Sequence, residues 1–111
     1  MNIAKTPPIR YYAVIFSSLR TEGDNGYSTT SQVMRERVQK QPGYLGHESA
    51  RDSLGITVSY CADLGSIKKW KANEQHLIAQ RVGRSTWYSA YKIRICKVER
   101  DYDFSTDIQK S

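Results

Sequence analysis

The segment Tyr11–Phe16 constrains the fold more than any other part of the chain, because both of its alternating sets of residues are apolar. The run is rich in aromatic and β-branched residues and follows Pro7 and Pro8, which cannot continue a helix. It therefore predicts a β-strand over Tyr11–Ser18. Successive side chains of a strand point to opposite faces of its sheet. Both faces of this sheet therefore need a cover.

Two segments carry apolar residues at helical spacing. The first runs from Tyr27 to Gln41 and is ended by Pro42, and the second runs from Leu64 to Val82. Asp63 is a good N-cap for the second helix, and Gly83 supplies its C-terminal stop. Each helix has one apolar stripe, and we expect each helix to pack this stripe against a face of the sheet.

Three further strands complete the pattern. Tyr44–Asp52 and Gly55–Cys61 read as a β-hairpin, and Trp87–Val98 alternates in the same way near the end of the chain. The order βαββαβ predicts an α+β, ferredoxin-like fold, with a four-stranded antiparallel sheet and both helices on one face. In its usual strand order, four-one-three-two, Cys61 and Cys96 lie roughly 9 to 10 Å apart, beyond the reach of a disulfide.

Length and composition favour one folded domain. The chain has 111 residues, of which 39% are hydrophobic and 25% charged, and it divides into an arm (1–10), a domain (11–102) and a polar tail (103–111). Apolar runs of about six residues are far shorter than the roughly 20 that cross a bilayer. No segment reads as a secretory signal, so we expect no membrane contact and a cytoplasmic protein.

The net charge of +6 raises the question of an anionic partner. Its basic residues are dispersed and interleaved with Glu36 and Glu74, which is typical of solvated helix faces and not of a nucleic-acid patch. The third strand, Gly55–Tyr60, also offers one aromatic and no basic residue, whereas RNA-recognition modules place basic, glycine and aromatic residues there. The two cysteines lack metal-ligand spacing. Nucleic acid and metal are therefore not expected.

The uncovered face of the sheet indicates a partner. A second copy, packed sheet against sheet about a two-fold axis, would cover it and form a homodimer. The alternative is that long Lys and Arg stems shield the open face.

Four runs resemble the antibiotic biosynthesis monooxygenase family over about residues 11 to 102: Tyr11–Phe16, Gln41–Gly46, Gly55–Tyr60 and Ile67–Lys71. A closing set is similar to a subgroup of small, largely uncharacterised bacterial proteins: Gly83-Arg84, Trp87-Tyr88, Tyr91 and Val98–Arg100. This resemblance implies a dimeric α+β barrel. It also implies an oxygenase that oxidises polyphenolic compounds without metal or flavin, or a haem-cleaving protein, although many members have no known activity.

The resemblance allows the haem-cleaving hypothesis to be tested residue by residue. In the haem-cleaving members an axial histidine follows the helix tryptophan by about three turns, and that position is Gln80 here, a poor iron ligand. The first strand also has no asparagine, which those members carry. Haem degradation is therefore disfavoured, and a monooxygenase that needs no cofactor and acts on a planar aromatic or quinol is the leading hypothesis. The alternative is a non-catalytic ligand-binding or stress-related dimer.

The expected cavity lies between the helices and the concave sheet. Trp70 is the family's tryptophan and could stack on a planar ligand, although a tryptophan on an apolar stripe is more often core. Substrate-binding candidates are Trp70, Asn73, Glu74, Met34 and Val38, and catalytic candidates are His76, Tyr60 and Tyr91. His76 is the candidate base, with a solvated or capping histidine as the alternative. The tyrosines would donate to an oxyanion or simply pack, and His47 reads as a surface or interface histidine.

Overall fold

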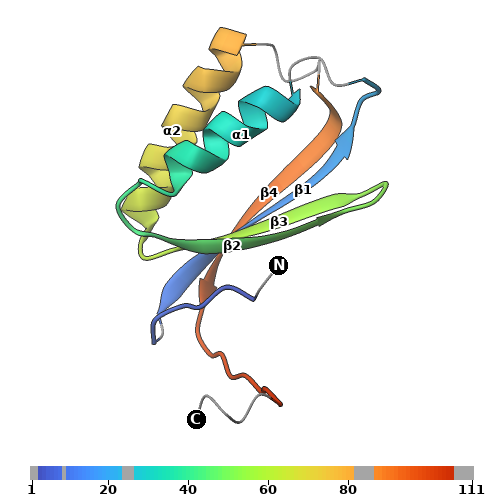
Figure 1. Cartoon of the computed structure of the whole chain (residues 1–111). Helices are drawn as coiled ribbons and strands as arrows, with labels where there is room; N and C mark the ends of the chain where they lie inside the picture. The colour runs from blue at the N-terminus through green and yellow to red at the C-terminus, as the bar shows by residue number, and fades with distance from the viewer. Residues whose placement is uncertain (1–2, 9, 24–26, 82–86, 107–111) are drawn as a thin grey trace.

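The computed structural model describes residues 3–8, 10–23, 27–81 and 87–106, apart from the side chains of residues 27, 30 and 74–81. Figure 1 shows a sheet with two helices on one side. Its elements are β1 (Tyr11–Arg20), α1 (Tyr27–Val38), β2 (Tyr44–Arg51), β3 (Gly55–Cys61), α2 (Leu64–Arg81) and β4 (Tyr88–Val98). The predicted βαββαβ order and α+β fold class are confirmed.

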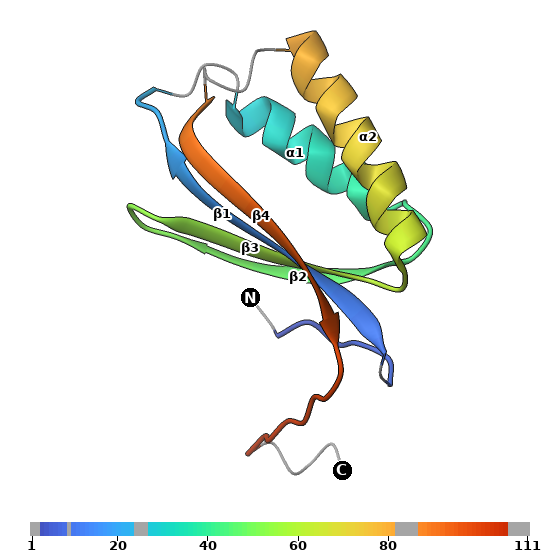
Figure 2. The same cartoon turned by 180° about the vertical axis from the view of Figure 1, so that it is seen from behind.

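The sheet has the order β2-β3-β1-β4, and every neighbouring pair is antiparallel. This is the expected strand order, with β1 at the centre between β3 and β4. Seen from behind, both helices still lie on the same side of the sheet (Figure 2). No helix among the described residues is long and apolar enough to cross a membrane.

Element ends differ from the prediction by a few residues. β1 continues to Arg20 and not only to Ser18, because the amide of Thr21 and the side chain of Arg20 both donate to the carbonyl of Trp87, at 2.8 and 2.9 Å. α1 ends at Val38, before the predicted end at Gln41. The amides of Lys40 and Gln41 bond to carbonyls three residues back, which is the tighter geometry of a closing turn.

The turn after α1 is held against the start of α2. Gly43 has a φ of +84°, and its carbonyl accepts a 2.7 Å hydrogen bond from the amide of Ala62. Asp63 caps α2 as predicted, because its carboxylate accepts a 2.7 Å hydrogen bond from the amide of Ser66. Gly83, the predicted stop, lies outside the described residues.

The register divides the strands between two faces. Val14 lies opposite Ser59 and Ile95, and it shares the helix-facing side of the sheet with them. Ile15 lies opposite Val58 and points to the other side, which we call the outer face. Cys61 and Cys96 fall on opposite faces and are both free thiols, which agrees with the expectation of no disulfide.

The segments that flank the domain both reach the outer face. The amide of Ala4 donates to the carboxylate of Glu48 on β2 at 2.9 Å, so the N-terminal arm crosses this side. The hydroxyl of Tyr11 donates to Asp101, which ties the start of the C-terminal tail to the sheet. Beyond that bond the tail leaves the sheet (Figures 1 and 2), and Tyr102 and Phe104 are 92% and 87% exposed.

Replacing Gly43 with alanine is expected to lower the free energy of unfolding by about 1–2 kcal/mol, the cost of placing a side chain in the left-handed region. The new Cβ would also overlap the side chain of Ser66 at the start of α2. Urea unfolding followed by circular dichroism measures the change. Gln39→Ala, at an exposed position of the same turn, is the control. An unchanged midpoint for Gly43→Ala would contradict the assignment.

Candidate functional site

A cavity of about 1120 Å³ lies between the two helices and the helix-facing side of the sheet. This volume is slightly above the range of about 300–1,000 Å³ that is typical of small-molecule sites. The cavity is partly open to solvent, and every helix and strand of the fold contributes to its described lining. It lies where the sequence analysis expected it.

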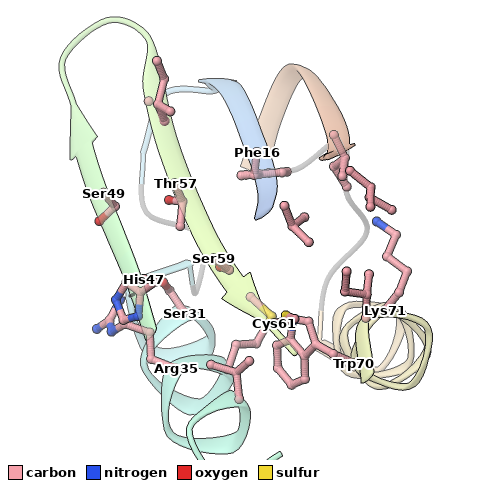
Figure 3. Close-up of a pocket in the computed structure, with 18 of the residues that line it drawn as sticks. Phe16, Ser31, Arg35, His47, Ser49, Thr57, Ser59, Cys61, Trp70 and Lys71 are labelled. Carbon is pink, nitrogen blue, oxygen red and sulfur yellow. Dashed lines mark hydrogen bonds between the residues drawn. The ribbon is translucent and has the colours of Figure 1, made fainter. Parts of the chain in front are cut away.

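One wall of the cavity is apolar. Its residues come from β1, β4 and both helices: Val14, Phe16, Met34, Val38, Ile67, Trp70, Ile93 and Ile95. Trp70 is half-buried, and in Figure 3 its indole lies beside Cys61 with the cavity above it. A half-buried indole on an apolar wall presents a flat surface on which a planar ligand can stack. Met34, Val38 and Trp70 therefore take the positions that the sequence predicted for them.

The opposite end of the cavity is polar, and the sequence analysis did not anticipate it. Hydroxyl groups of β2, β3 and α1 gather there with His47 and Arg35, as Figure 3 shows. The guanidinium of Arg35 donates to the hydroxyl of Ser31 at 3.0 Å, one helical turn earlier. Nδ1 of His47 hydrogen-bonds the hydroxyl of Tyr44. We call Ser31, Arg35 and His47 the polar end of the cavity.

A signal for the polar end was present in the sequence. His47, Ser49 and Arg51 alternate along one strand, so they share one face, and this face proves to be the helix-facing one. Periodicity identifies such a set but does not say which side the helices cover. The tertiary structure was therefore needed to decide whether His47 lies at the surface or in the cavity.

Tyr60 does not line the cavity, and its expected place there is wrong. It lies opposite Ala13 and points to the outer face, where its hydroxyl donates to Glu48 at 2.9 Å and its ring meets Tyr11 edge-on at 5.9 Å. Burial, followed by the hydrogen bond to Glu48, raises the pKa of Tyr60 to about 12. The phenol therefore stays protonated near neutral pH and already has an acceptor.

Tyr91 is on the helix-facing side but outside the described lining. Its ring packs against Phe16 and Tyr88 at centroid distances of 5.5 and 5.9 Å, and it is 37% exposed. This aromatic cluster borders the cavity through Phe16, which belongs to both. The structure thus gives Tyr91 a packing role and a partly exposed ring next to the site.

The remaining predicted residues are on α2 beyond Trp70. Asn73 is exposed and does not belong to the described lining. The side chains of Glu74, His76 and Gln80 lie outside the described residues, so their roles stay predictions. Within the residues that the structure describes, no three His, Cys, Asp or Glu side chains are grouped so as to hold a metal ion.

Cys61 lines the cavity at the end of β3. It is buried, and burial raises the pKa of its thiol.

Over 100 residues the chain is 46% identical to the Bacillus subtilis protein YqjZ, an uncharacterized protein, and the match covers 88% of each chain. The chain belongs to the YqjZ family. A scan against protein-family models finds no match.

Solved structures with the same fold are far less similar in sequence. SnoaB, a cofactor-independent oxygenase from Streptomyces nogalater, superimposes with a TM-score of 0.66 at 7% identity, over 82% of this chain and 95% of that chain. PA3566 from Pseudomonas aeruginosa gives 0.63 at 13% identity, over 87% and 100%. MhuD, crystallised with two manganese protoporphyrin IX molecules per active site, gives 0.59 at 14% identity, over 84% and 99%. The chain therefore has the antibiotic biosynthesis monooxygenase fold, as its resemblance to that family predicted.

The raised pKa of Tyr60 predicts a loss of stability at alkaline pH. An unfolded tyrosine ionises near its ordinary pKa of 10.0, whereas the folded phenol ionises at about 12. The contribution to stability is complete below pH 10 and is lost as the pH rises through about 12. Urea unfolding of wild type and Tyr60→Phe between pH 8 and 12 checks this. The variant should lose less stability over that window, and identical slopes would contradict the prediction.

Proposed function

We propose that this protein is a cytoplasmic oxygenase that binds a planar aromatic or quinol-type small molecule in the cavity and oxidises it with O2 without a cofactor. One observation carries the proposal: a half-buried indole, Trp70, stands on the apolar wall of a cavity of ligand size. The shared fold with a cofactor-independent oxygenase supports the reaction class, because the same arrangement of sheet and helices surrounds the site.

The reaction places modest demands on the protein. For an anthrone, the reacting CH2 carbon loses two hydrogens and gains one oxygen atom of O2, and the second oxygen atom leaves as water. The substrate supplies all four electrons, so the protein needs only to bind it, remove a proton and stabilise the resulting anion. Trp70 and the apolar wall hold the ring. His76, on α2, is the candidate proton acceptor, and its side chain lies outside the described residues.

One observation favours the alternative, a non-catalytic binding protein. Tyr60 points away from the cavity, Tyr91 packs in an aromatic cluster, and Asn73 is exposed. Among the described lining residues, His47 is then the one histidine, and its Nδ1 is already hydrogen-bonded to the hydroxyl of Tyr44. A cavity with so few side chains that can donate or accept a proton can serve binding alone.

Oxygen uptake decides between the two. Chelator-treated protein should consume O2 above the uncatalysed rate with at least one member of a panel of anthrones and reduced naphthoquinols. Trp70→Phe should lower kcat/KM by up to about tenfold, which corresponds to the loss of an aromatic contact. Lys69→Ala, exposed on the same helix and outside the lining, should match wild type. Binding without uptake across the panel would support the non-catalytic alternative.

We further propose that the protein is a homodimer joined through the outer faces of two sheets. Ile15 and Val58 lie opposite each other on this face and are only half-buried within one chain. Tyr102 and Phe104 are exposed on the segment that leaves the sheet after β4 (Figure 1). Burying such side chains against a second copy removes apolar surface from water. Arg94 lies beside Ile15, so shielding by long basic side chains is the competing explanation.

Light scattering after size-exclusion chromatography tests the dimer. Wild type should have a mass of about 25 kDa, twice the 12.7 kDa of one chain. Ile15→Lys should shift the mass toward 12.7 kDa, because two like charges would meet near the two-fold axis, with the circular dichroism spectrum unchanged. Ser53→Lys, on the exposed β2–β3 turn, should remain dimeric. A monomeric wild type would instead support shielding by basic side chains.

A further inference from the structure

The charged residues in the described part of the cavity lining are all basic. The described lining contains Arg35, Arg51, Lys68 and Lys71, and it contains no aspartate or glutamate. The chain as a whole has eleven acidic residues against seventeen basic ones, so acidic side chains are not scarce. A cavity with low-dielectric walls and charges of one sign concentrates ligands of the opposite charge. This distribution points to an anionic ligand.

The basic residues differ in what they already contact. Arg51 is bound within the sheet, because its guanidinium donates to the hydroxyl and the carbonyl of Ser18. Arg35 donates to the hydroxyl of Ser31, which is a neutral acceptor on the same helix and does not cancel the positive charge. A guanidinium has five N–H donors in a planar fork that matches a carboxylate. Of the two arginines, Arg35 is therefore the better-placed anion anchor.

His47 adds a second donor at the same end of the cavity (Figure 3). Its Nδ1 is hydrogen-bonded to the hydroxyl of Tyr44, and burial raises the pKa of that phenol, so the hydroxyl keeps its proton. When this hydroxyl donates to Nδ1, a neutral imidazole carries its own proton on Nε2. Nε2 is then a donor for a ligand, as are the hydroxyl of Ser31 and the guanidinium of Arg35.

We propose that the ligand of this cavity is a planar aromatic acid, with its ring against Trp70 and its carboxylate at the polar end formed by Ser31, Arg35 and His47. The inference rests on the proposed function in that both place an aromatic ring in the same cavity. The inference goes beyond the proposed function because it assigns a charge to the ligand and a position to the charged group. Apolar wall and polar end then recognise the two halves of one molecule.

A matched pair of ligands tests the charge separately from the ring. Binding of 1-hydroxy-2-naphthoate and of 1-naphthol, which lacks only the carboxylate, is measured by titration calorimetry and by quenching of tryptophan fluorescence. Wild type should bind the acid at least about tenfold more tightly, the gain from one charge-assisted hydrogen-bonded pair. The preference should shrink as NaCl rises, because salt screens partly exposed charges.

Variants locate the anchor. Arg35→Gln should abolish the preference for the acid and leave 1-naphthol binding unchanged. Arg37→Gln removes the same charge from an exposed position of α1 outside the lining, and it should keep the preference. Trp70→Phe should weaken both ligands and remove most of the quenching, because Trp87 is fully buried and absent from the described lining.

The outcomes distinguish failure of this inference alone from failure of the proposed function. Equal affinities of wild type for the two ligands would overturn the aromatic-acid inference and leave aromatic binding intact. Loss of the preference in Lys71→Gln but not in Arg35→Gln would overturn the position assigned to the carboxylate. Absence of binding for both ligands would overturn the inference together with the proposed aromatic site.

Discussion

The structure depends on the pairing of β1 with strands on both of its edges. β3 and β4 are hydrogen-bonded to it along nearly its whole length, so the orientation of each β1 side chain is fixed relative to both neighbours. Val14 and Phe16 face the helices and form part of the cavity wall. Ile15 faces the other way. A shift of the register by one residue would exchange the two sets and destroy the cavity and the outer face together.

The two tryptophans differ in burial, and this difference gives one a structural role and the other a place in the proposed binding site. Trp87 is fully buried, and its carbonyl accepts hydrogen bonds from Arg20 and Thr21, so it holds the end of β1 against the start of β4. Trp70 is half-buried and its ring borders the cavity. Burial stabilises the fold in the first case. In the second, partial exposure leaves an aromatic surface for a ligand.

The sequence predicted the helices and strands well. It did not predict which face of the sheet the helices cover. Helix and strand patterns, the Asp63 cap and the strand order are confirmed. Tyr60 was misplaced because alternation says which residues share a face and not which face the helices cover. For the same reason, the sequence did not predict that Cys61 and His47 line the cavity. Both belong to the face that the helices cover.

The sequence by itself determined the element order, and with it the fold, because hydrophobic periodicity and capping residues act locally along the chain. It also identified Trp70, Met34 and Val38, since the apolar stripe of a helix must turn toward the sheet. Only the tertiary structure decided that Ser31, Arg35 and His47 meet at one end of the cavity while Tyr60 turns away from it. Those positions depend on strand register and on helix packing between segments far apart in the chain, which no local pattern encodes.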